Sequence, residues 1–221
     1  MKKNHVNLFF LNLYMIKIPI QMGSIDLNWK KFLEKGDEAS FEAIYITYVD
    51  DLFAYGMGLG YQREMCKDAI QDTFMKFYLC RNDLRQIENI TGYLFKSFKN
   101  RLIDLARKNR NNDSIELMED RFTIEVTVLD NIIESETRAI LKKRVRLLLN
   151  QLTPNQQEAI YLKYVVGISH KEIAVILNMR EESARKLLYR AMEKLRQKAT
   201  EDNLFDKTVV LTLINLFCQL M

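Results

Sequence analysis

Apolar residues recur along most of this chain at intervals of three and four, which is the spacing of a helix with one buried face. The pattern predicts helices over residues 26–36, 37–59, 63–79 and 90–109. Prolines and glycines, which interrupt helices, number only two and seven in 221 residues. With 48% hydrophobic residues, the chain can bury one large core or two small ones. We therefore predict an all-α fold.

The apolar faces of these helices are rich in aromatic residues, and we expect them to form the core. The expected core positions are Trp29, Phe32, Leu33, Phe41, Ile44, Tyr45, Tyr48, Leu52, Tyr55, Ala69, Ile70, Phe74, Phe77, Tyr93, Leu94, Phe95 and Phe98. The rings at 93–98 have a second interpretation, because basic residues interleaved with aromatic ones can hold single-stranded nucleic acid. For most of these rings we expect burial instead. Gly56, Gly58 and Gly60 are expected to end the second helix, and residues 80–89 to form a loop.

The region from Ser169 to Lys198 has the spacing of two helices joined by a tight turn. Ser169 is a suitable N-cap for a short first helix, whose apolar positions follow at the spacing of one face. Asn178 is expected in the turn, because asparagine tolerates a left-handed backbone. A second apolar series begins at Ala184 and continues to Leu195. The sequence therefore predicts a helix-turn-helix in the C-terminal part.

The outward face of this second helix is predicted to be strongly basic. It carries Arg185, Lys186, Arg190, Lys194, Arg196 and Lys198. Such a face suits the phosphates that flank a major groove. A merely solvated helix would carry similar charges, but the capped first helix and the turn together favour DNA binding.

Charge is distributed unevenly along the chain. The formal net charge is only +4, so a nucleic-acid surface has to come from local clusters. Residues 96–110 contain six Lys or Arg and one Asp, whereas residues 110–137 contain two Arg and eight Asp or Glu. Residues 111–135 also have little sustained helical period. We interpret them as an acidic linker between two small helical domains.

The sequence offers little for catalysis. Its three cysteines, Cys66, Cys80 and Cys218, are widely spaced and indicate a reduced cytoplasmic protein. His5 and His170 are the only histidines, and no zinc spacing, glycine-rich phosphate loop or Ser/His/Asp set can be assembled. We therefore expect no enzyme, no cofactor and no metal site.

Both ends of the chain stand apart from the predicted domains. Residues 1–23 form an extension that we interpret as a disordered arm or as sequence ahead of a native start at Met22. It lacks the cleavage site of a signal peptide. Residues 201–221 form a tail that is nearly uncharged from Thr208 onward, yet too short to be a convincing membrane span. We expect no stable membrane insertion, and we expect the tail to cover a groove of its own domain or to bind a partner protein.

Two segments resemble bacterial RNA polymerase sigma factors. Residues 68–74 (DAIQDTF) and 92–104 (GYLFKSFKNRLID) resemble their second region, and residues 152–191, which begin LTPNQQ and end YRA, look like their fourth region. The order of the two motifs without a large middle domain is similar to the extracytoplasmic-function (ECF) group of the sigma-70 family. The resemblance implies a subunit that docks on core RNA polymerase and directs it to promoter DNA, with an anti-sigma factor as a further partner.

The resemblance also implies a domain plan and three binding surfaces. Residues 24–110 would form sigma region 2 and residues 136–200 sigma region 4, on either side of the linker. The core-polymerase surface would include Asp68, Gln71, Asp72 and Phe74, whose carboxylates are expected to be exposed. The minus-ten DNA surface would include Lys96, Lys99, Asn100, Arg101, Arg107 and Lys108, with Asn100 holding a flipped base. The minus-thirty-five DNA surface would include Arg180, Ser183, Arg185, Lys186 and Arg190.

One alternative stays open from the residues alone. The chain could be a stand-alone helix-turn-helix regulator, in which residues 24–110 form a sensor or dimerisation domain. That alternative predicts operator binding without polymerase.

Overall fold

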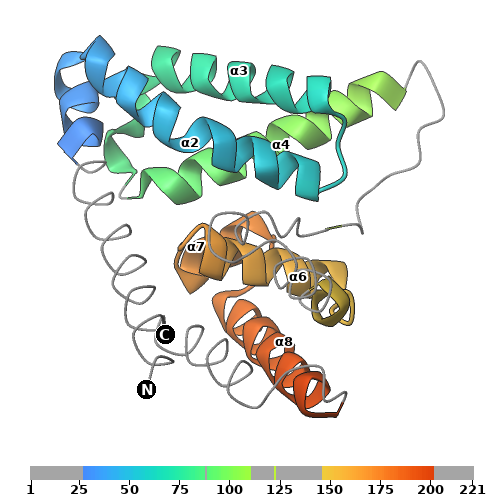
Figure 1. Cartoon of the computed structure of the whole chain (residues 1–221). Coiled ribbons are helices and arrows are strands. Elements are labelled where there is room, and N and C mark those ends of the chain that lie inside the picture. The colour runs from blue at the N-terminus through green and yellow to red at the C-terminus, as the bar shows by residue number, and fades with distance from the viewer. Residues whose placement is uncertain (1–26, 88, 111–121, 123–145, 202–221) are drawn as a thin grey trace, which may run out of the picture.

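The computed structural model describes residues 27–87, 89–110, 122 and 146–201 (Figure 1). Within them, residues 27–110 and residues 146–201 each form a group of helices, called here the N-terminal and C-terminal units. The predicted extension, the tail after residue 201 and the predicted linker, apart from Phe122, lie outside the described residues.

The N-terminal unit is formed by four helices and one 3-10 turn. Residues 27–35 are helical, and they are followed by α2 (Glu38–Gly58), α3 (Arg63–Leu79), the 3-10 helix η1 (Arg81–Gln86) and α4 (Ile90–Arg110). The carboxylate of Asp37 caps α2 by accepting a 2.9 Å hydrogen bond from the N–H of Ser40. Within the described residues, the predicted helix boundaries agree with these to within one residue.

Two local expectations were wrong. Gly56 lies inside α2 and does not end it, since the helix continues to Gly58, and residues 81–86 form a 3-10 helix where a loop was expected. A Cβ atom at Gly56 would lie only 2.7 Å from the sulfur of Cys66 and 2.9 Å from the ring of Phe98. The glycine is therefore explained by the close packing of α2 against its neighbours and not by a helix end.

The aromatic stripe forms the core of this unit, as predicted, with one exception. Phe32 and Phe77 are fully buried and their rings stack with centroids 5.2 Å apart. Phe95 and Phe98 are fully buried as well, so these rings are not free to stack on bases. Tyr45 differs, because it is 38% exposed, although its ring makes an edge-on contact with the buried ring of Phe74.

The C-terminal unit contains the predicted helix-turn-helix and more. Residues 146–149 are helical, and α6 (Pro154–Ile160) continues directly into a π-helical turn, η2 (Tyr161–Val165). They precede α7 (His170–Ile176) and α8 (Glu181–Glu201). Thr153 starts α6 with a capping box that it shares with Gln156.

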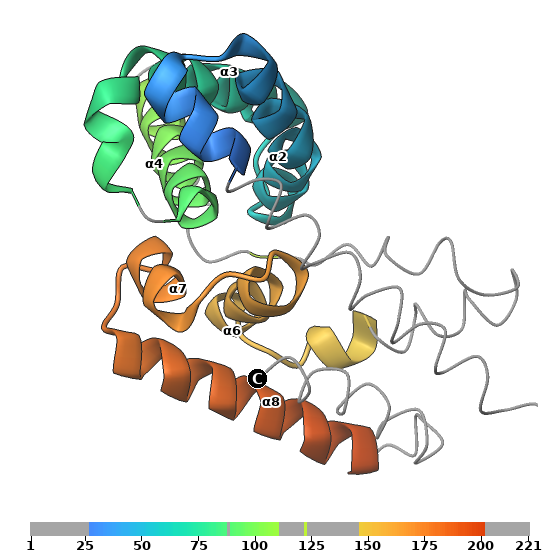
Figure 2. The same cartoon turned by 90° about the vertical axis from the view of Figure 1, so that its left-hand side faces the viewer.

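The two units lie against each other, with α6 and α7 between the N-terminal unit and α8 (Figures 1 and 2). Helices α4 and α7 are in contact, and the buried hydrophobic residues of both units form one continuous cluster. Helix α8 packs on α6 and α7, so its outer face points away from the N-terminal unit.

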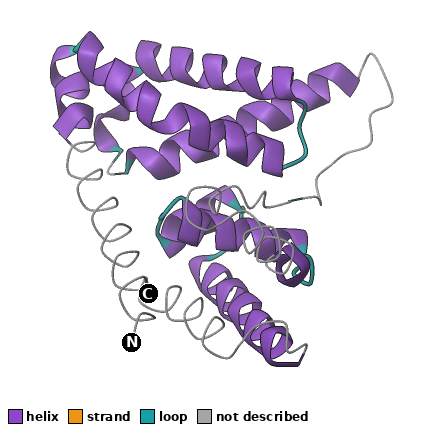
Figure 3. Ribbon diagram, viewed as in Figure 1, coloured by secondary structure: helices purple, strands orange, loops and turns teal. Residues whose placement is uncertain are grey.

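Every regular element of the described residues is a helix (Figure 3), which confirms the predicted all-α class. None of the described helices is both long and apolar enough to cross a membrane. In the same residues, no group of His, Cys, Asp and Glu side chains could hold a metal ion.

Candidate nucleic-acid interface

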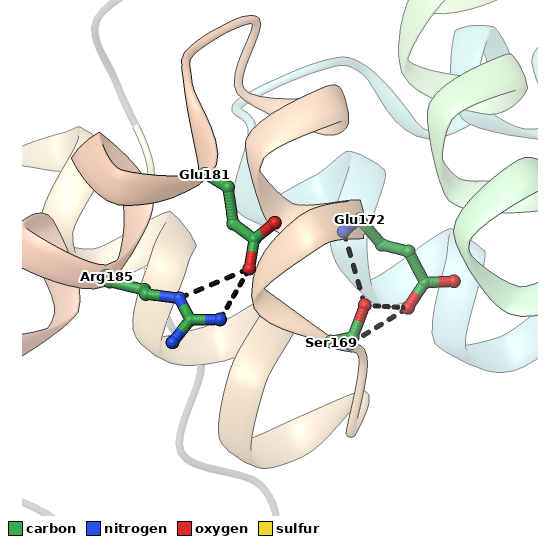
Figure 4. Close-up of polar contacts among 4 residues, drawn as sticks. All are labelled: Ser169, Glu172, Glu181 and Arg185. Atoms are coloured by element: carbon green, nitrogen blue, oxygen red, sulfur yellow. Dashed lines mark hydrogen bonds and ion pairs between the residues drawn. The ribbon is translucent and has the colours of Figure 1, made fainter.

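The first helix of the helix-turn-helix is fixed at its start by a capping box (Figure 4). The Ser169 hydroxyl oxygen accepts from the N–H of Glu172, and the Glu172 carboxylate accepts from the N–H of Ser169 at 2.9 Å. Two backbone N–H groups that the helix itself cannot pair are thereby satisfied. The predicted N-cap is confirmed.

The turn between α7 and α8 has the predicted left-handed residue. Asn178 has φ 55°, while the N–H groups of Asn178 and Met179 donate to the carbonyls of Val175 and Ala174. This pairing is the Schellman arrangement that ends many helices, with asparagine in the position that glycine usually occupies. It sets the angle at which α8 leaves the turn.

The residues predicted to contact the minus-thirty-five element lie together at the start of α8. All of them are exposed: Arg180, Ser183, Arg185, Lys186 and Arg190. Further along the helix the basic face is less open, since Lys194, Arg196 and Lys198 are only half-exposed. The N-terminal half of α8 is thus the part most accessible to a polyanion.

Acidic residues one turn earlier hold two of these basic side chains. Arg185 donates to the Glu181 carboxylate at 2.6 Å, and Lys186 is 2.6 Å from Glu182 (Figure 4 shows the first pair). The hydrogen bond from Arg185 lowers the pKa of Glu181. Because both pairs are exposed, they can exchange for contacts with phosphates or bases at little cost.

Helix α4 carries the second predicted DNA surface, and its residues differ widely in accessibility. Asn100, Arg107 and Lys108 are exposed. Lys99 is only 18% exposed, because its ammonium lies 2.6 Å from the Glu158 carboxylate of the C-terminal unit. Lys96 is half-buried beside it, and burial together with the charge of Lys99 lowers its pKa.

The predicted core-polymerase surface lies on α3 beside an apolar groove. Asp68 and Gln71 are exposed, and Phe74 is buried with its ring against Tyr45. The groove has a volume of about 670 Å³ and runs between α2 and α3. It is lined by Phe41, Tyr45, Val49, Asp50, Phe53, Arg63, Lys67, Ile70, Gln71, Phe74, Met75 and Tyr78.

The expectation of two exposed carboxylates was wrong for Asp72. Its carboxylate is half-buried and paired with the Arg101 guanidinium of α4 at 2.6 Å. Asp72 and Arg101, predicted for two different surfaces, are thus partners within the N-terminal unit.

The sequence interpretation missed the contact between the two units. Glu158 of α6 accepts a hydrogen bond from the Tyr55 hydroxyl at 2.5 Å and another from Lys99 at 2.6 Å. Phe122, from the expected linker, is buried with its ring centroid 5.9 Å from that of Tyr55. A glutamate directly before the apolar residues Ala159, Ile160 and Leu162 was the one available signal.

Comparison with known proteins agrees with this geometry. Residues 142–195 match the family Sigma-70, region 4. The chain is 23% identical to the ECF RNA polymerase sigma factor SigM of Bacillus subtilis, in a match that covers 71% of this chain and 93% of SigM. It is 23% identical to the RNA polymerase sigma-H factor of Pseudomonas aeruginosa, with coverage of 74% of this chain and 88% of the relative. It is 25% identical to the RNA polymerase sigma factor CarQ of Myxococcus xanthus, with coverage of 73% and 90% respectively.

A solved structure shares the fold. CnrH, in a complex with the cytosolic domain of CnrY, aligns with a TM-score of 0.52 at 19% identity and covers 81% of this chain and 99% of its own. The matched helix-turn-helix family lies over α6, α7 and α8, and the match to SigM extends over 158 residues, more than either helical unit contains. The chain belongs to the ECF group of the sigma-70 family of RNA polymerase sigma factors.

Proposed function

We propose that this sigma factor binds core RNA polymerase through α3, opens and reads the minus-ten element with α4, and reads the minus-thirty-five element with α8. The observation that carries the proposal is the exposed basic start of α8 on one unit together with an exposed amide and cations on α4 of the other. One chain therefore presents two separate nucleic-acid surfaces, as a protein that recognises two promoter elements needs.

Residues 136–200 act in this proposal as the minus-thirty-five domain. Arg185 and Lys186 lie in the first turns of α8, where a recognition helix meets base edges in the major groove. Arginine and lysine suit the paired acceptors of guanine, while Arg180, Ser183 and Arg190 are placed for further base or phosphate contacts.

Residues 24–110 act as the minus-ten and polymerase-binding domain. The exposed amide of Asn100 has the donors and acceptors to pair with the Watson–Crick edge of an extruded base. Arg107 and Lys108 follow on the same helix, where they can hold phosphates of the melted strand.

The polymerase contact is assigned to Asp68, Gln71 and the groove beside them. The exposed carboxylate suits a basic partner, and exposed Met75 and Tyr78 at the groove supply apolar area for the same contact. The site of action is the compartment of the polymerase, the cytoplasm.

In vitro transcription with purified core polymerase tests the function. Core polymerase with this protein should initiate from promoters of genes that depend on it, whereas core polymerase alone should not. Binding of the protein alone to a specific duplex, with no initiation when core polymerase is present, would instead favour the stand-alone regulator.

A further inference from the structure

Glu158 is a buried carboxylate that joins the two units. It is 4% exposed, and both of its hydrogen-bond donors, Tyr55 and Lys99, come from the other unit. A carboxylate in such surroundings is strongly unfavourable unless it is paired. The contact of Glu158 with Tyr55 and Lys99 therefore holds the two units together.

Aromatic rings seal this ion pair from water. Tyr55 and Tyr161 stack with an interplanar angle of 11° and centroids 5.9 Å apart, and Phe122 packs against both. The Tyr161 hydroxyl also donates to the backbone carbonyl of Asp51 at 3.5 Å. Exclusion of water strengthens the attraction between Lys99 and Glu158, since less solvent screens it.

The units also approach closely at the start of α4. A Cβ atom added to Gly92 would lie 2.5 Å from Oε1 of Glu172, the capping residue of α7. That oxygen is buried and has no hydrogen-bond partner among the described residues. The surface around Lys96 and Lys99 is consequently covered by the C-terminal unit.

This covering conflicts with DNA binding. An ammonium can pair with a carboxylate or with a phosphate, but Lys99 cannot contact Glu158 and DNA at the same time. The promoter elements are about 25 base pairs apart, or roughly 85 Å at 3.4 Å per step, whereas α4 and α7 are in direct contact here. The two units have to separate before both elements can be bound.

We propose that Glu158 acts as an internal substitute for a DNA phosphate, holding the free protein closed and keeping Lys96 and Lys99 from the minus-ten strand until the units separate. The proposal rests on the proposed function of α4. A polymerase or DNA surface that binds only the separated units shifts the equilibrium from the closed to the separated form. Without such a surface, the closed form keeps the free chain from binding single-stranded nucleic acid.

Binding of the free protein to a labelled oligothymidylate of about 16 nucleotides tests the lock, because phosphate contacts do not require a promoter sequence. Glu158→Ala should tighten binding roughly threefold or more, as the binding-competent fraction rises. Its radius of gyration in X-ray scattering should increase as well. Adding Lys99→Ala to this variant should remove much of the gain, because the released ammonium is then missing.

Glu64→Ala is the matched control. Glu64 is an exposed carboxylate, 2.8 Å from the Lys67 ammonium, and takes no part in the contacts of Glu158. Its replacement changes the net charge by the same amount. Equal affinities and equal radii for wild type, Glu158→Ala and Glu64→Ala would overturn the proposal. If Glu158→Ala does not fold, as circular dichroism would show, Tyr55→Phe decides, since it removes only the hydroxyl; unchanged affinity and radius in that variant would also overturn it.

Transcription with core polymerase separates this proposal from the proposed function. A wild-type protein that initiates normally, with junction variants that bind the oligonucleotide no better, would refute the lock alone. A wild-type protein that never initiates would refute the proposed function.

Discussion

Arg101 of α4 donates from Nε to Oδ2 of Asp72 on α3 at 2.7 Å, and its Nη2 lies 2.6 Å from the same oxygen. The pair connects a residue proposed for minus-ten DNA to one proposed for the polymerase. Both side chains are a little more than two-fifths exposed, so solvent screens the pair and limits its contribution to stability. A substitution at either residue also removes the partner of the other, so it should alter both proposed surfaces.

Charge reversal distinguishes the roles of Asp68 and Asp72. Asp68→Arg should weaken binding to core polymerase and leave the free energy of unfolding within about 0.5 kcal/mol of wild type, since the residue is exposed. Asp72→Arg should also weaken binding, but it should cost up to about 1 kcal/mol of stability because two guanidinium groups then face each other. Pull-down with core polymerase and denaturant unfolding measure the two effects.

The double variant Asp72→Arg, Arg101→Asp is the control for this experiment. It restores an ion pair of opposite polarity, so stability should recover while polymerase binding should not. Wild-type binding by the double variant would remove Asp72 from the polymerase surface.

The left-handed turn residue gives a prediction about folding of the helix-turn-helix. Asn178→Val should destabilise the protein by about 1–2 kcal/mol, because a β-branched side chain is strained at φ 55°. Asn178→Gly should be within about 0.5 kcal/mol of wild type, because glycine adopts this conformation readily. Denaturant unfolding measures both, with exposed Asn155→Val in α6 as a helical control. Equal losses for the two valine variants would contradict the role of the turn.

The turn and the junction show where sequence reasoning succeeds and where it stops. Ser169 and Asn178 were predictable because caps and left-handed turns depend on residues within one helical turn of each other. The bond between Tyr55 and Glu158 joins residues 103 positions apart, and periodicity carries no information about which helix faces another. Phe122 was missed for the same reason, since a single aromatic residue in an acidic stretch has no periodic pattern.

Burial of Cys66 predicts selective reactivity of the thiols. Its side chain is fully buried, and burial raises its pKa from 9.0 to about 11. At pH 8 iodoacetamide should therefore modify half-exposed Cys80 in the native protein and reach Cys66 only after unfolding. Peptide mass spectrometry gives the extent of modification at each position.

The same shift has a consequence for stability at high pH. Between about pH 9 and 11 the unfolded chain loses the Cys66 proton while the folded chain keeps it, so the contribution of this group to stability falls as pH rises. Cys66→Ala should show a weaker decline over this interval in denaturant unfolding. Identical pH profiles would show that the thiol remains accessible to solvent in the folded state.

Arg185 and Lys186 are predicted to read bases in the upstream promoter element. Arg185→Ala and Lys186→Ala should each weaken binding of the specific duplex by about 1–3 kcal/mol, with a smaller loss on random duplex. Glu182→Ala is a useful comparison, because it frees the Lys186 ammonium without removing it. Equal losses on specific and random duplexes would mean that the two residues contact phosphates only.

The role proposed for Asn100 is tested by separating DNA opening from DNA binding. Asn100→Ala should leave polymerase binding and duplex binding by the C-terminal unit unchanged, because Asn100 lies on the exposed side of α4, in neither surface. Open-complex formation should fall, since unpairing and unstacking a base cost a few kcal/mol that contacts in the melted state must offset. Permanganate reactivity of unpaired thymines measures the opening.

A promoter with a pre-melted bubble at the minus-ten element provides the control for that measurement. The unpairing cost is then already met by the template, so the Asn100→Ala holoenzyme should recover much of the wild-type signal. Asn82→Ala, an exposed amide of the same unit outside α4, should behave as wild type on both templates. Normal opening of the fully paired promoter by Asn100→Ala would contradict the base-pocket role. A defect that the bubble does not relieve would instead place Asn100 among the phosphate contacts, because such contacts are needed on either template.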